Sequence, residues 1–127
     1  MAEPYSKSRQ LGPKRRPRRV FRKRAGKREW AAIIEAKLGP CRVCNSSAPN
    51  GRVFGRIHMH HLVPRSWGGD DVAENIAPLC PICHEAVTTR DPRTLQVLAR
   101  SLTIAEHAYI VGRLGAAGPE RLFGVPV

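Results

Sequence analysis

Residues 58–86 read HMHHLVPRSWGGDDVAENIAPLCPICHEA, and the rest of the chain is arranged around them. This stretch contains four of the five histidines and two of the four cysteines. An extended segment ends in a histidine pair, a turn rich in Gly and Asp follows, and a short apolar segment leads into Cys-x-x-Cys-His. The pattern predicts a small metal-built scaffold that carries a histidine-rich site, and it indicates nucleic-acid chemistry.

The four cysteines form two pairs with the same two-residue gap, Cys41-x-x-Cys44 and Cys80-x-x-Cys83. Two such knuckles supply four thiolates, a set that suits tetrahedral zinc, whereas buried thiols without a metal need no paired spacing. A site closed by four thiolates has no open coordination position, so we expect the zinc to be structural. Residues 45–79 lie between the knuckles and contain three of the histidines.

The length of 127 residues gives room for one small domain with tails, and so small a core gains from a structural metal. No apolar run approaches the roughly 18–20 residues of a membrane helix, and the N-terminus has no apolar signal core. We therefore expect an intracellular protein without a membrane partner. In a reducing compartment, paired cysteines favour zinc over disulfides.

The positive charge is concentrated near the N-terminus. Residues 1–37 carry 13 Lys and Arg against 3 acids, a net of +10, and residues 38–127 carry 9 against 7, a net of +2, which together give +12. The segment 14–28 has ten Lys and Arg and no acid. We expect this arm to be disordered on its own and to bind nucleic-acid phosphates in a salt-dependent way. A solvated tail and a localisation signal are the alternatives.

Local patterns predict the elements around the motif. Trp30, Ile33, Ile34 and Leu38 recur at helical spacing. We expect Trp30 to anchor this helix in the core, with a platform for base stacking as the alternative. We expect helices and extended segments in the following order: a helix at 27–38, extended chain at 52–62 and 75–79, and helices at 81–89, from Asp91-Pro92, and from Thr103 to Gly115. The last helix begins with a capping box, Thr103 to Glu106, and its expected buried stripe is Ile104, His107, Val111 and Leu114.

Residues 41–84 resemble the HNH endonuclease family, in the variety with two zinc knuckles. The resemblance rests on His-His-Leu-Val-Pro at 60–64, Gly-Gly-Asp-Asp at 68–71, Glu-Asn-Ile-Ala-Pro-Leu-Cys at 74–80 and Pro-Ile-Cys-His at 81–84. His61, Asn75 and His84 occupy the three positions that name the family. The resemblance implies an α+β fold with a ββα-metal, treble-clef-like core, a four-cysteine zinc site and flanking helices.

The same resemblance implies a division of the chain and a setting for it. We expect a disordered basic arm at 1–26, a zinc-stabilised HNH nuclease domain at 27–90 and a C-terminal helical extension at 91–127. The likeness to small stand-alone phage and bacterial HNH proteins implies DNA as the partner and the cytoplasm of a bacterial or phage-infected cell. It also implies association with a phage terminase or other DNA-processing proteins.

The resemblance assigns a role to each residue of the motif. His61 would be the general base that takes a proton from the attacking water, and His60 and His84 would hold one divalent cation at the scissile phosphate. The side-chain amide of Asn75 would form a hydrogen bond across the loop and so hold His61 in the orientation that catalysis needs. Because adjacent strand residues point to opposite faces, the roles of His60 and His61 stay interchangeable at this point.

The identity of this cation follows from the number of its ligands. Many relatives carry a further metal-binding histidine at the position of Thr88 here. Two protein ligands completed by water and phosphate favour Mg²⁺ or Mn²⁺ over zinc. His58 alternates with His60 along the predicted strand, and we expect it at the surface, with ligation of the cation as the alternative.

These features predict a metal-dependent HNH endonuclease that hydrolyses DNA phosphodiester bonds, by nicking or by cutting both strands. Two alternatives stay open. One is a structure-specific nuclease for branched DNA, in which the C-terminal helices would form a dimer. The other is a zinc-knuckle nucleic-acid-binding protein with an inactive site, against which the complete set of His61, Asn75 and His84 argues.

Overall fold

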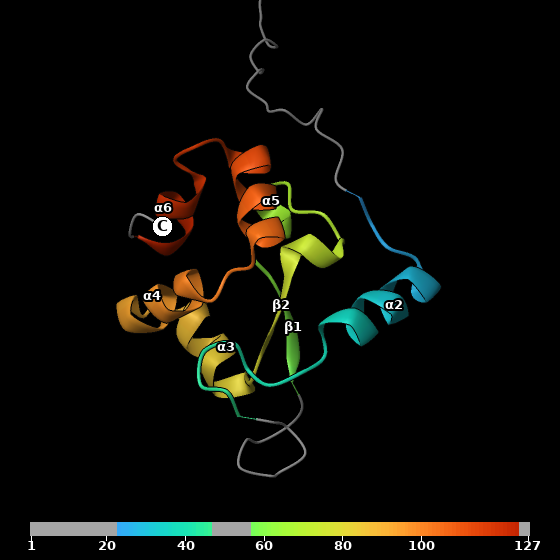
Figure 1. Ribbon diagram of the computed structural model, residues 1–127, viewed down its shortest axis with the longest axis horizontal. Helices are drawn as coiled ribbons and strands as arrows, with labels where there is room; N and C mark the ends of the chain where they lie inside the picture. Colours follow the sequence, from blue (N-terminus) through green and yellow to red (C-terminus); the bar gives the residue numbers. More distant parts are fainter. Residues whose placement is uncertain (1–22, 47–56, 125–127) are drawn as a thin grey trace, which may run out of the picture.

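The computed structural model describes residues 23–46 and 57–124. A two-stranded antiparallel sheet lies at its centre, where β1 (His58–His61) pairs with β2 (Ile76–Leu79). Helices surround this hairpin, with α2 (Lys27–Lys37) on one side, α3 (Pro81–Thr88) and α4 (Pro92–Arg100) on the other, and α5 (Ile104–Leu114) and α6 (Gly118–Phe123) near the loop that joins the strands (Figure 1). The expected α+β class is confirmed, and β1, β2 and α3 form the ββα unit.

Residues 62–75 connect the two strands through two short 3-10 turns, Arg65–Trp67 and Ala73–Asn75. The chain folds back closely on itself at Gly69. A Cβ atom there would lie 1.8 Å from the carbonyl oxygen of Val63, so only glycine fits this position. This close return brings the Gly- and Asp-rich turn back to the end of β1.

Three helices begin at the residues that the sequence predicts. Cys80 caps α3, where its Sγ accepts from the amide of Cys83 and Pro81 follows in the first turn. Asp91 caps α4 by accepting from the amide of Thr94 at 3.0 Å. The capping box of Thr103 and Glu106 begins α5. These helix starts are confirmed because each depends on a local signal in the sequence, a first-turn proline at Pro81 and capping residues at Asp91 and Thr103.

One hydrophobic core joins the first knuckle, the hairpin and the C-terminal helices. Its buried members include Cys41, Leu62, Val63, Leu79, Val87, Leu98, Ile110 and Phe123. The expected extension at 91–127 therefore packs on the same core as the hairpin, as far as residue 124. The residues of these helices that are buried in the core are Leu95, Leu98 and Ala99 of α4, Ile110 of α5, and Leu122 and Phe123 of α6.

The buried face of α5 differs from the expected stripe. Ile104 is 91% exposed, and the residues that α5 buries are Glu106 and Ile110. The prediction is therefore wrong for Ile104, whereas Leu114 of the same stripe is half-buried and packs against the core. The physical reason is that α5 turns a carboxylate inward to meet cations from α2 and the first knuckle, which apolar periodicity does not reveal.

The apolar residues of α2 are also placed differently. Ile33 is buried, but Leu38 is 63% exposed. Trp30 is half-buried and stacks on His61, with ring centroids 5.8 Å apart. The prediction that Trp30 anchors α2 in the core is therefore wrong, because its ring covers a histidine of β1 instead.

Glu106 joins three elements by charge. It is fully buried, and its carboxylate accepts from the guanidinium of Arg42 at 2.8 and 2.7 Å, from the amide of Thr103, and from Lys37 at the end of α2. Burial raises the pKa of Glu106, but the bonds from Arg42 and Lys37 outweigh it and lower the pKa to about 2. The carboxylate is therefore ionised and fixes α2 and the knuckle to α5.

Parts of two expected elements lie outside the described residues, namely 1–22 of the basic arm and 52–56 of the first extended segment. Within 23–46 and 57–124, no helix combines the length and the apolar character that crossing a bilayer requires.

Replacing Glu106 with Gln would leave Lys37 and Arg42 beside a neutral amide. We expect the free energy of unfolding at neutral pH to fall by about 3 kcal/mol. Because the folded pKa lies below the ordinary value of 4.5, the wild-type advantage is present above that value and is lost as the pH falls towards about 2. Urea unfolding of both proteins from neutral to acid pH measures the difference.

The difference between the two proteins removes effects that they share, such as protonation of the cysteines. Glu120→Gln, on the exposed face of α6, is the matched control and should change the stability little. A difference between wild type and Glu106→Gln that did not vary with pH would contradict the assignment.

Candidate metal centre and active site

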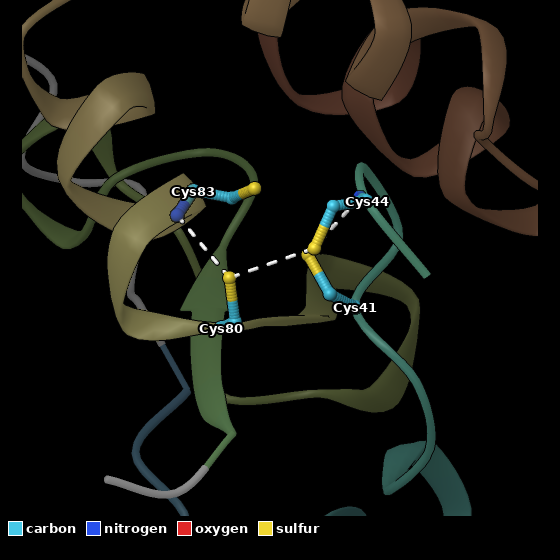
Figure 2. A group of neighbouring side chains, drawn as sticks. All are labelled: Cys41, Cys44, Cys80 and Cys83. Carbon is cyan, nitrogen blue, oxygen red and sulfur yellow. Dashed lines mark hydrogen bonds between the residues drawn. The ribbon is translucent and has the colours of Figure 1, made fainter. Parts of the chain in front are cut away.

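Four cysteines from two separate segments meet at one point (Figure 2). Their four Sγ atoms all lie within 4.8 Å of one another, and those of Cys44 and Cys80 are 3.8 Å apart. Tetrahedral zinc with bonds of about 2.3 Å would separate its sulfur ligands by about 3.8 Å. The cysteines therefore lie where they can hold a metal ion, and the donor set fits zinc.

Backbone bonds bring the first knuckle to the second. The amide of Arg42 donates to the carbonyl of Pro78 at 2.9 Å, which places the first knuckle beside the end of β2. Within that knuckle, the amide of Asn45 donates to the carbonyl of Cys41 at 2.8 Å. Asn45 has a positive φ of 64°, a conformation that asparagine tolerates better than most residues. These backbone bonds close the turn without a metal.

The thiols of the cluster differ in acidity. Burial raises the pKa of Cys44, but hydrogen bonds with Ser46, Cys41 and Cys80 outweigh it and lower the pKa to about 7. Burial raises the pKa of Cys83, and the neighbouring thiols Cys80 and Cys41 raise it further. Burial also raises the pKa of Cys80. A buried thiolate cluster of this kind is stable when a cation compensates its charge. The electrostatics of the cluster therefore agree with a metal site.

The histidines of β1 divide between the two faces of the strand. His58 and His60 lie towards α3, where the ring centroids of His60 and His84 are 5.2 Å apart. His61 lies towards α2, where it stacks on Trp30. At the end of the strand, His60, His61 and His84 nevertheless line one cavity of about 510 Å³. The structure therefore brings together the three histidines to which the resemblance gives roles.

Two of these histidines are neutral at physiological pH. Burial lowers the pKa of His60 to about 4, and charges on His84 and His61 add to the shift. Burial and the charge of His58 also lower the pKa of His84. A neutral imidazole has an unprotonated nitrogen for a metal, so both side chains are in the state that ligation requires.

A buried carboxylate, Asp71, holds His61. Its Oδ1 lies 2.8 Å from Nε2 of His61, and its side chain is 3% exposed. It also accepts from the amide of Ala25 and pairs with Arg24 and Arg65. Burial raises the pKa of Asp71, but the bonds from His61 and Ala25 and the charge of Arg65 outweigh it, so the carboxylate is ionised.

No local pattern in the sequence identifies Asp71 as the partner of His61. The available signal was its place in Gly-Gly-Asp-Asp, ten residues after His61. That signal does not say which of the two aspartates meets the histidine. The neighbouring Asp70 points elsewhere and accepts from the hydroxyl of Tyr109 and from Arg113.

The last residues of the expected arm are attached to this loop. The amide of Lys23 donates to Asp70 at 2.5 Å, and Ala25 and Arg24 contact Asp71. Gly26 then caps α2. Residues 23–26 therefore lie against the turn that carries the two aspartates.

Asn75 closes the loop between the strands. It is fully buried, its Oδ1 accepts from the amide of Val63 at 2.7 Å, and its Nδ2 donates to the carbonyls of Val63 and Asp70 at 3.0 Å. The bond across the loop that the sequence analysis expects is present. Through it, Asn75 joins the end of the strand that carries His61 to the turn that carries Asp71.

Residues 41–90, which contain both knuckles, the hairpin and α3, match the family model described as HNH endonuclease. They are an HNH domain. A segment of 58 residues is also 36% identical to EcoKMcrA, a type IV methyl-directed restriction enzyme of Escherichia coli (strain K12). The match covers 42% of this chain and 20% of that enzyme, so it spans about a fifth of the relative.

We expect one zinc ion per chain at the cysteine cluster. Cys41→Ser and Cys80→Ser should each lose folded structure, because the buried thiols would no longer be joined through a metal. Elemental analysis and circular dichroism measure the two effects. Ser46→Ala, which changes a neighbour of Cys44 that is not a proposed ligand, is the control. A folded preparation that contains no zinc would contradict this assignment.

Proposed function

We propose that the protein is a metal-dependent endonuclease that hydrolyses DNA phosphodiester bonds. The convergence of His60, His61 and His84 on one cavity of the HNH domain supports this proposal most directly. His60 and His84 would hold one divalent cation. When bound, that cation would stabilise the negative charge that develops on the scissile phosphate and on the leaving oxygen.

His61 is the proposed general base. Since the ionised carboxylate of Asp71 can only accept, the proton of neutral His61 lies on Nε2 and is donated to Asp71. This tautomer leaves Nδ1 free to take a proton from the attacking water. The carboxylate also stabilises the imidazolium that then forms, and the stacked ring of Trp30 limits rotation of the imidazole.

Asn75 is the proposed positioning residue of the loop. Its amide contacts backbone groups of Val63 and Asp70 and does not line the cavity. It would therefore act through the placement of His61 and Asp71.

Mg²⁺ or Mn²⁺ is the proposed catalytic cation. Thr88 directs its hydroxyl to the carbonyl of His84 at 2.9 Å, so its side chain is not counted among the proposed ligands. Zn²⁺ is proposed for the cysteines.

The basic arm is the proposed site of sequence-independent DNA binding. Its last residues lie on the loop that holds Asp70 and Asp71, so phosphates bound by the arm would lie close to the cavity. We also propose, from the family likeness, the division at residues 26 and 90, a cytoplasmic location in a bacterial or phage-infected cell, and association with a terminase or other DNA-processing proteins.

His61→Ala should lower the rate of plasmid nicking by roughly 10²- to 10⁴-fold, because the general base is removed. DNA affinity and thermal stability should stay near those of the wild type. His84→Ala should also abolish nicking, but excess Mn²⁺ should partly rescue it and should not rescue His61→Ala. His107→Ala, which changes a histidine of α5, is the control. Normal nicking by folded His61→Ala would exclude His61 as the base.

Asp71→Asn tests the carboxylate behind the base. An amide oxygen can still accept from Nε2 of His61 but carries no charge, so nicking should slow less than in His61→Ala. Its rate should also show a changed dependence on pH, since the imidazolium loses a charged partner. A pH–rate profile identical to that of the wild type would show that Asp71 does not act on the base.

Two truncations separate DNA binding from the placement of the loop. Removing residues 1–22 should weaken DNA binding and flatten its salt dependence, while turnover at saturating DNA stays near normal. Removing residues 1–25 keeps Gly26 at the start of α2 but also deletes the contacts to Asp70 and Asp71, so turnover should fall as well. Salt-dependent binding and plasmid nicking measure both.

Equal turnover of the two truncated proteins would show that residues 23–25 do not support the site. An unchanged salt dependence in both would place the DNA-binding charge outside the arm.

A further inference from the structure

We propose that His58 is a positioning residue for His84. By holding Nδ1 of the His84 ring, His58 directs Nε2 of that ring into the cavity, where the cation would bind. The inference rests on the proposed function, because it concerns the cation site between His60 and His84. It gives a role to a histidine that the sequence analysis expected at the surface.

The geometry of the pair carries the proposal. His58 lies on the same face of β1 as His60, opposite Leu79, and α3 crosses this face. Nδ1 of His58 is 2.8 Å from Nδ1 of His84, which is hydrogen-bond distance, and the two rings meet edge to face with centroids 5.0 Å apart. The residue is exposed, yet its ring is aimed at one atom of its neighbour.

This contact determines which nitrogen of His84 is left for a cation. An imidazole has two nitrogens, so when Nδ1 is engaged with His58, only Nε2 remains for a cation. A histidine that binds a metal through one nitrogen commonly donates the other N–H to an acceptor, which fixes both the tautomer and the direction of the ring. Here His84 would donate from Nδ1 to the unprotonated Nδ1 of His58, whose own proton lies on Nε2.

Direct ligation by His58 fits the structure less well. The cavity is lined by His60 and His84, whereas His58 is not among the described residues that line it. Among the described residues, the four cysteines are the group of three or more side chains that lie close enough together to hold one metal ion. The imidazoles of His58, His60 and His84 do not form such a group. His58 therefore lies behind His84 as seen from the cavity.

Nuclear magnetic resonance tests the tautomer directly. In zinc-loaded protein with ¹⁵N-labelled histidines and no added cation, long-range ¹H–¹⁵N spectra near neutral pH should show His84 with its proton on Nδ1. His58→Ala should lose this preference. His58→Asn should retain it, because the amide oxygen of asparagine can accept in the place of Nδ1. A wild-type His84 protonated on Nε2 would overturn the proposal.

Cation affinity supplies a second measurement. Ni²⁺ binds imidazole more tightly than Mn²⁺ and is a suitable probe for calorimetric titration of the zinc-loaded protein. His58→Ala should weaken Ni²⁺ binding roughly 10- to 100-fold, the usual effect of removing an orienting partner, and His58→Asn should restore most of it. His107→Ala should bind as the wild type does. Equal affinities of His58→Ala and the wild type would overturn the proposal.

The spectra and the titration distinguish a failure of this inference from a failure of the proposed function. If the wild type bound no Ni²⁺, the cation site would fail, while the spectra would still decide whether His58 fixes the tautomer of His84. If excess Zn²⁺ shifted a ring nitrogen of His58 as strongly as those of His60 and His84, His58 would be a ligand, and the positioning role would be wrong.

Discussion

The side-chain amide of Asn75 closes the long connection between the two strands, and the arrangement of the site depends on this closure. Its three hydrogen bonds satisfy backbone groups of Val63 and Asp70 that the buried loop would otherwise leave unpaired. The absence of a side chain at Gly69 lets the backbone come this close. As a result, the turn returns to the end of β1, and Asp71 meets His61. A loop without regular structure thus gains a fixed geometry from one buried side chain.

Buried carboxylates join other segments of the chain through hydrogen bonds and ion pairs, as the amide of Asn75 joins the two ends of the loop. Asp70 and Asp71 attach residues 23–25 and α5 to the turn, and Glu106 attaches α2 and the first knuckle to α5. Each is paired with cations, as a buried charge must be.

The sequence could predict the features that depend on local spacing. The cysteine pairs, the helix start at Pro81, the caps at Asp91 and Thr103, and the bond of Asn75 across its loop are each evident within a short segment or a known motif. The pairing of Asp71 with His61, and of Glu106 with Lys37 and Arg42, could not be predicted, because no local pattern connects these acids to those partners. The errors at Trp30 and Ile104 have the same origin. Apolar periodicity predicts which face of a helix is hydrophobic. It does not predict that a helix buries a carboxylate or covers a histidine.

The alternation of side chains along β1 also bears on the proposed chemistry. A general base must keep a free nitrogen for water, whereas a cation ligand gives its nitrogen to the metal, so the two tasks compete if both imidazoles face one ion. His60 and His61 are adjacent, and the strand turns them to opposite faces, one towards His84 and the other towards Asp71. The strand ends immediately after His61, where both rings border the same cavity. Two neighbouring residues can thus serve one phosphate without competing for one cation, and the strand end that Asn75 fixes is the part of the structure that makes this possible.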